Sequence, residues 1–87
     1  MTKQFSLKVV PNPAHSKLNF QVNGLVENLE TMLTLINTDG AVVFTMKLPL
    51  SGGQYSNSMN ISWFPKGIYY LKASNLHDHV IQKVVLQ

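Results

Sequence analysis

The sequence predicts an all-β protein, a single immunoglobulin-like antiparallel β-sandwich of about seven strands. Three observations support this prediction. Short segments in which apolar and polar residues alternate recur at intervals of about ten residues. Clusters of Gly, Pro, Asn and Asp, which favour turns, separate these segments. The strands do not alternate with helix-length segments as they do around parallel sheets, so they are expected to pair in the antiparallel sense.

The first two strands are expected at Leu7–Val10 and Lys17–Val22, separated by a segment that begins with Pro11, Asn12 and Pro13. Proline fixes φ and has no backbone N–H, so the first strand cannot continue through this segment in the interior of a sheet. Asn12 precedes a proline, which favours extended geometry, and its side chain can satisfy nearby backbone groups. The Pro-Asn-Pro segment is therefore predicted to form a rigid corner that sets the direction of the second strand.

The next two strands are expected at Met32–Asn37 and Ala41–Lys47, as a hairpin closed by the tight turn Asn-Thr-Asp-Gly. The Asn37 side chain can accept hydrogen bonds from the backbone of the turn, and Asp39 is a favoured turn residue. Gly40 occupies the position at which φ is often positive, which glycine adopts without a steric penalty. These three residues are predicted to have a structural role.

Three further strands are expected after a loop at residues 48–57, namely around Ser58–Ser62, at Gly67–Ala73 and at Val80–Leu86. Pro65 pre-sets φ for the turn before the second of these strands, and Gly67 supplies backbone freedom. Tyr69 and Tyr70 must face opposite sides of their strand, and Tyr69 is expected to point into the core. Gly24–Thr31 is the segment of this sequence that could form a helical turn.

Composition and charge argue against several classes of function. The chain has 87 residues and a formal net charge of +3, with seven lysines and neither Arg nor Cys. Because the lysines are scattered and Arg supplies bidentate contacts to phosphate and guanine, nucleic-acid binding is not expected. The lack of Cys excludes disulfides and thiolate zinc sites. No apolar run approaches the ~18 residues of a membrane helix, so stable membrane insertion is not expected either.

No cluster of residues indicates catalysis, a cofactor or a metal. His77 and His79 would point the same way on a strand, as metal ligands do, but two histidines are not a site and His15 lies far away in the sequence. Turn residues are the better interpretation of His77-Asp78-His79. No serine or threonine is accompanied by a recognisable base and orienting acid, and Ser51–Gly53 is too short for a phosphate loop. An enzymatic function is not expected.

Four aromatic residues fall within eight positions: Trp63, Phe64, Tyr69 and Tyr70. Exposed aromatic rings can form a platform for sugars, so a carbohydrate- or surface-binding module is an alternative function. Trp63 and Phe64 flank a turn, where one ring can instead cover an end of the sandwich. A structural spacer of a secreted protein is a further alternative.

Four segments, in this order and spacing, resemble a known family: "VVPNPAHSKLNF", "LINTDGAVV", "FPKGIYYLKA" and "IQKVVLQ". Together they are similar to the C-terminal sorting domain (type A) of proteins exported by the type IX (Por) secretion system of Bacteroidota. The resemblance covers residues 7–87, and residues 1–6 are interpreted as an N-terminal linker. One departure is Gln87, since the family commonly ends on a basic residue.

The resemblance implies an address for secretion rather than an enzymatic activity. A passenger domain fused to the N-terminus would travel through the periplasm and cross the outer membrane by the type IX translocon. A sortase would usually remove the domain upstream of residue 7, leaving the passenger at the cell surface or outside the cell. Because the N-terminus lacks the features of a secretory signal peptide, the signal for export to the periplasm is expected in a longer precursor.

We hypothesise that the translocon recognises nine residues of this domain. They are the residues that match the family motifs: Pro11, Asn12, Pro13, Gly67, Tyr69, Lys83, Val84, Val85 and Leu86. The corner and the final strand are favoured, because a C-terminal edge strand offers unpaired backbone groups for docking. An exposed first or last strand also allows copies to pair, so a monomer or a weak edge-strand dimer is expected.

Overall fold

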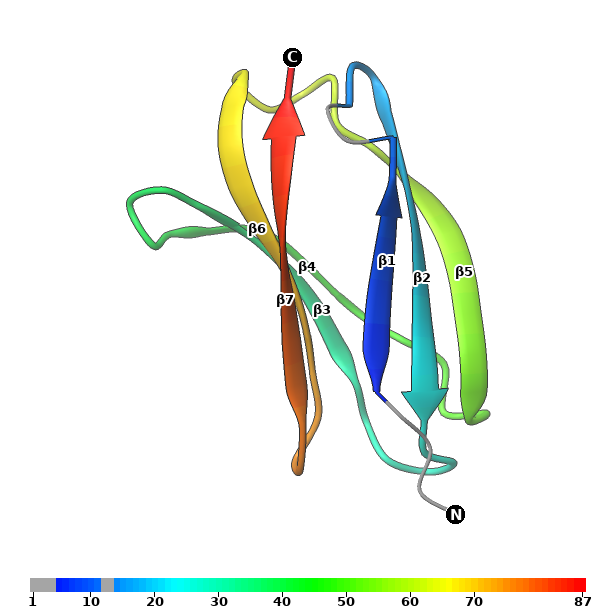
Figure 1. The fold of residues 1–87 in the computed structure, drawn as a ribbon. Coiled ribbons are helices and arrows are strands. Elements are labelled where there is room, and N and C mark those ends of the chain that lie inside the picture. Colours follow the sequence, from blue (N-terminus) through cyan, green and yellow to red (C-terminus); the bar gives the residue numbers. More distant parts are fainter. Residues whose placement is uncertain (1–4, 12–13) are drawn as a thin grey trace.

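The strands of the protein lie in two layers that face each other (Figure 1). The computed structural model describes residues 5–11 and 14–87, so Asn12 and Pro13 of the predicted corner lie outside the described residues. The described residues form β1 (Ser6–Val10), β2 (Lys17–Leu25), β3 (Met32–Asn37), β4 (Val42–Lys47), β5 (Gly53–Asn60), β6 (Gly67–Ser74) and β7 (His79–Leu86).

Within the described residues, one sheet has the strand order β1-β2-β5 and the other has the order β4-β3-β6-β7. All neighbouring strands are antiparallel. The predicted fold class, an immunoglobulin-like antiparallel sandwich of about seven strands, is confirmed. The fourth strand pairs with β3 rather than with β5, and it therefore widens the sheet that contains the last strand.

Apolar side chains at alternate strand positions fill the space between the sheets. On β2, the side chains of Leu18, Phe20 and Val22 are no more than 3% exposed. The opposite sheet contributes side chains that are 0% exposed, among them Leu33, Leu35, Leu71 and Val84. Full burial of each such side chain contributes roughly 1.5–3 kcal/mol, so this alternation accounts for much of the stability of the fold.

The predicted strand bounds agree with the observed ones within one residue for five of the strands, and β2 and β5 are the exceptions. The predicted start of β5 near Ser58 was wrong, because the strand begins at Gly53 and residues 53–57 are not a loop. Tyr55 lies opposite Val22 on β2, and its ring centroid is 6.1 Å from that of Phe20. The remaining residues of this edge strand are mostly polar, so the alternation was too weak to recognise in the sequence.

The predicted helical turn at Gly24–Thr31 was also wrong. β2 continues to Leu25, through a register shift at Gly24, whose φ is +83°. The shift turns Leu25 into the core, where it is 2% exposed. The following connection is closed by a hydrogen bond from the Leu29 N–H to the Val26 carbonyl oxygen (3.1 Å). A positive φ at Gly24 is incompatible with a helix, and one glycine in the sequence does not reveal it.

The sandwich has two distinct ends along its longest dimension of 39 Å (Figure 1). We call the first the corner end, which consists of the β1–β2 connection, the β5–β6 connection at residues 61–66 and the C-terminal end of β7. The basal end consists of the start of β1 and the connections at residues 26–31, 48–52 and 75–78. The β3–β4 hairpin projects sideways from the body of the sandwich (Figure 1).

Candidate functional site

The chain that follows the predicted corner is attached directly to the last strand. The Ala14 N–H donates a hydrogen bond to the Val85 carbonyl oxygen (2.8 Å), and the Gln87 N–H donates to the Ala14 carbonyl oxygen (2.7 Å). These bonds form a parallel bridge between Ala14 and Leu86, and Ala14 is 0% exposed. The chain directly after the predicted corner is therefore bonded to the final strand, which the sequence suggested separately.

The β5–β6 connection is attached to the same place. The Ile61 N–H donates a hydrogen bond to the Ser16 carbonyl oxygen (3.0 Å), which connects the start of this connection to the chain after the corner. Ile61 is 1% exposed and belongs to the core. Three of the four sequence motifs thus meet at the corner end: the corner, the Pro-x-Gly turn and the last strand (Figure 1).

In the turn before β6, the side chain of Tyr69 is bonded to the backbone of Pro65, four residues earlier. The Tyr69 hydroxyl donates a hydrogen bond to the Pro65 carbonyl oxygen (2.5 Å), and Tyr69 is 5% exposed. Gly67, between them, has a φ of +148°, a conformation that residues with side chains rarely adopt. A tyrosine at this corner of an immunoglobulin-like sandwich commonly makes such a bond to the backbone upstream. Phe64 packs against Tyr69, with the ring centroids 6.3 Å apart.

Burial divides the predicted recognition residues into two groups. Tyr69, Val84 and Leu86 are no more than 5% exposed, so a partner of the folded domain cannot touch much of them. The described residues that reach the surface are Pro11 and Lys83, which are exposed, and Gly67 and Val85, which are half-buried. Recognition of the folded domain at the predicted residues would therefore involve this second group.

The outward side chains of β6 and β7 surround Lys83 and Val85 with apolar groups. Antiparallel pairing places Tyr70 opposite Lys83 and Ile68 opposite Val85. Ile68, Tyr70 and Ile81 are 41%, 38% and 51% exposed. We call these five residues the β6–β7 outer face. Ile68 and Ile81 were not among the predicted recognition residues, although the alternation of apolar residues along both strands was a signal for them.

The edge of β7 is partly covered. Its C-terminal end carries the Ala14 bridge, so the Val85 carbonyl and the Gln87 N–H are already engaged. An added strand would have to displace Ala14 to pair with these groups. These two backbone groups of the last strand, at the edge where docking was predicted, are therefore already hydrogen-bonded within the domain.

The hairpin turn lies apart from the corner end (Figure 1). The Asn37 side-chain oxygen accepts hydrogen bonds from the Asp39 N–H (2.9 Å) and the Ala41 N–H (3.0 Å). Gly40 has a φ of +85°, and its N–H donates to the Asn37 carbonyl oxygen (3.1 Å). Asn37, Asp39 and Gly40 thus close the turn and do not join the predicted recognition residues.

The histidines are not gathered at one place. His77 and Asp78 lie in the β6–β7 turn at the basal end, where the Asn75 side-chain oxygen accepts hydrogen bonds from both of their N–H groups (2.8 and 2.7 Å). His15 lies at the corner end. In residues 5–11 and 14–87, no three His, Cys, Asp or Glu side chains are grouped to hold a metal ion. The same residues contain no helix long and apolar enough to span a membrane.

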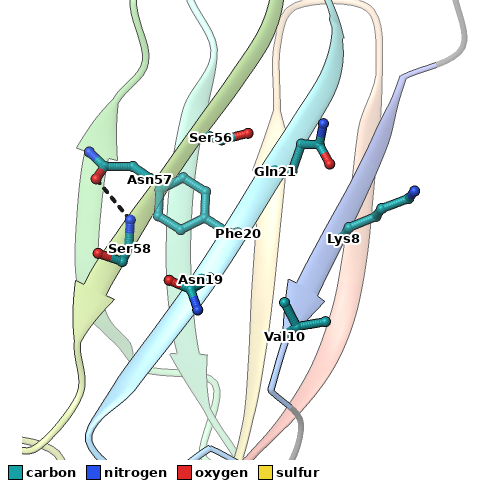
Figure 2. Close-up of a pocket in the computed structure, with 8 residues that line it drawn as sticks. All are labelled: Lys8, Val10, Asn19, Phe20, Gln21, Ser56, Asn57 and Ser58. Carbon is teal, nitrogen blue, oxygen red and sulfur yellow. Dashed lines mark hydrogen bonds between the residues drawn. The ribbon is translucent and has the colours of Figure 1, made fainter.

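A shallow depression of about 490 Å³ crosses the sheet of β1, β2 and β5 (Figure 2). It is lined by Lys8, Val10, Asn19, Phe20, Gln21, Ser56, Asn57 and Ser58. Phe20 is the aromatic residue of this lining, and it is 3% exposed. The depression therefore presents no ring face on which a sugar could stack, and it does not support the carbohydrate-binding alternative.

Comparison with protein families gives a direct result. The family described as secretion system C-terminal sorting domain matches residues 8–87 of the 87-residue chain. The chain belongs to this family. A comparison with curated proteins found no match. The resemblance inferred from the sequence motifs is thereby confirmed.

A sorting domain of this family is a C-terminal signal for type IX secretion. It acts on a fused passenger, is recognised by the type IX machinery, and directs export toward the cell surface or the extracellular space. The family is not a family of enzymes.

Proposed function

We propose that the sorting domain carries an N-terminal passenger from the periplasm across the outer membrane, and that the type IX translocon recognises it at the corner end and the β6–β7 outer face. A surface sortase then cleaves the chain upstream of residue 7, and residues 1–6 act as the linker, of which Ser6 is also the first residue of β1. Cleavage there would fall close to the start of β1 at Ser6 and would leave the sandwich nearly whole.

The observation that carries this proposal is the attachment of Ala14, the residue after the predicted corner, to β7. Ala14 and Leu86 lie at opposite ends of the sequence, and they meet only when both sheets have formed. A receptor that contacts the corner and the last strand together would therefore bind the folded domain and not an unfolded chain. Such a receptor would export passengers whose sorting domain has already folded.

The position of the passenger fits this arrangement. β1 begins at the basal end, so a passenger that precedes it would approach the sandwich from the side opposite the corner end (Figure 1). The longest dimension of the domain, 39 Å, separates the two ends. A compact passenger on that side would leave the corner end accessible to the translocon.

The buried and exposed motif residues have different roles in the proposal. Tyr69, Val84 and Leu86 act through the fold, because they hold the corner end together from inside. Pro11 and Lys83 are the exposed residues that the translocon contacts. Lys83 also presents a positive charge beside the exposed ring of Tyr70, which would orient a complementary surface.

The test is a charge reversal at Lys83 in a reporter fused to the sorting domain. We expect Lys83→Glu to lower translocon-dependent export severalfold, while Lys8→Glu, the same change on an exposed lysine of the other sheet, leaves export unchanged. Thermal unfolding of both purified variants separates recognition from stability. Equal export of the two variants would contradict the proposed recognition surface.

A further inference from the structure

Trp63 is 82% exposed, and it lies in the β5–β6 connection at the corner end. An indole ring buries about 150–250 Å² when it packs fully, so this is a large apolar surface to leave in water. Phe64, the next residue, packs against the core instead. Phe64 therefore covers the end of the sandwich, and the ring of Trp63 is not needed for that purpose.

The connection that carries Trp63 is fixed on both sides of the ring. The Phe64 N–H donates a hydrogen bond to the Ile61 carbonyl oxygen (3.1 Å), which closes a turn around Trp63. Before it, the Ser62 N–H and hydroxyl both donate to the Asn60 side-chain oxygen (2.9 and 2.6 Å). The ring is thus presented from an ordered turn, which lowers the entropy lost when a partner binds it.

Charge is distributed unequally between the two ends. Lys17, which pairs with Asn60 at the end of β5, and Lys66 of the β5–β6 connection are exposed at the corner end. Of the four carboxylate residues, Glu27, Glu30 and Asp78 lie in connections of the basal end, and Asp39 lies in the hairpin turn. Glu30 at the basal end is further paired with Lys47, with 3.5 Å between the charged atoms. The corner end therefore presents an apolar ring in a positive field.

We infer that Trp63 is the apolar anchor of a protein-docking surface whose cationic border is Lys17 and Lys66. The partner surface would be an apolar pocket bordered by carboxylates. Tryptophan is the residue type most enriched among the few that dominate binding energy in protein interfaces, and opposite charges around such an anchor set orientation and association rate. This inference rests on the proposed function, because it places the pocket on the type IX translocon.

A protein pocket fits these residues better than a lipid surface. Trp63 is flanked by the exposed polar residues Ser62 and Lys66 and by Pro65, so one ring stands alone among groups that water solvates. Peripheral binding to a membrane generally requires a broad apolar face or several anchors. A single ring in a connection that also carries Lys66, and that begins beside the Lys17–Asn60 pair, matches one pocket with a charged border.

The experiment measures binding of the purified sorting domain to detergent-solubilised type IX translocon. Trp63→Ala is expected to weaken binding by at least about tenfold, as loss of an interface anchor does. The matched control is Leu76→Ala, because Leu76 is also 82% exposed but lies at the basal end. This control should change binding less than about twofold, as near-neutral surface positions do. The Lys17→Glu, Lys66→Glu double variant should weaken binding most at low salt.

The chain contains one tryptophan, so 5-fluorotryptophan gives a single fluorine resonance from position 63. A change in the chemical shift of this signal on addition of translocon would report a change in the surroundings of the ring, whereas broadening alone would report only that the domain has bound a large complex. Unchanged binding by Trp63→Ala, with wild-type binding intact, would overturn the inference and leave the proposed function standing. No wild-type binding, together with no translocon-dependent export, would contradict the proposed function itself. If Trp63→Ala loses binding to phosphatidylglycerol vesicles but keeps its binding to the translocon, the partner of the ring is a lipid, and the inference is overturned.

Discussion

Replacing Gly67 by valine should destabilise the domain by about 1–3 kcal/mol, because Gly67 has a φ of +148° that side chains rarely tolerate. The magnitude comes from the backbone alone. Among the described residues, no heavy atom lies within 4 Å of a Cβ placed at this position, so steric crowding adds nothing. Gly67→Ala should therefore share most of the penalty, since both side chains force the same change of backbone conformation.

The assay is thermal unfolding followed by far-ultraviolet circular dichroism. For a domain of this size each 1 kcal/mol lowers Tm by roughly 4–8 °C, so Gly67→Val should melt about 4–24 °C below wild type. The control is Lys66→Val, a substitution at the exposed neighbouring residue, which does not have a positive φ and should stay within about 0.5 kcal/mol. Melting of Gly67→Val and Gly67→Ala at the wild-type temperature would refute the reasoning.

Three other substitutions test the structural claims by the same unfolding assay. Tyr69→Phe should lower the free energy of unfolding by about 0.5–1.5 kcal/mol, since it removes the hydrogen bond to the Pro65 carbonyl; no loss would mean that the bond is unimportant. Thr31→Val should raise the free energy of unfolding by about 1 kcal/mol, because the buried Thr31 hydroxyl has no hydrogen-bond partner among the described residues. A lower free energy of unfolding would contradict this reason. Asn37→Ala should lower the free energy of unfolding by about 1 kcal/mol, because it removes two hydrogen bonds to the backbone of the hairpin turn. An unchanged free energy of unfolding would argue against a role of Asn37 in closing the turn.

The fold could be predicted because its signals are local. Alternation along Lys17–Val22 and the Asn-Thr-Asp-Gly turn each depend on neighbouring residues, and both appear as expected. The inward position of Tyr69 and the outward position of Tyr70 follow from the two-residue period of a strand, and burial confirms them. The polar strand β5 was shortened because its side chains carry little apolar alternation.

The geometry of the corner end could not be predicted in the same way. The bridge between Ala14 and Leu86 joins residues from the two ends of the chain, and no local pattern marks it. Trp63 and Phe64 were equivalent in the sequence as candidates to cover the end of the sandwich. Only the packed structure distinguishes them, because the space beside Tyr69 accommodates the Phe64 ring.

The most direct test of the central claim is a fusion assay in a Bacteroidota host. Residues 1–87 are placed behind a fluorescent reporter that is exported to the periplasm, in strains with and without a working type IX translocon. We expect reporter on the cell surface or in the medium only when the translocon works. Retention of the reporter in the periplasm of both strains, with the domain shown to be folded, would contradict the account.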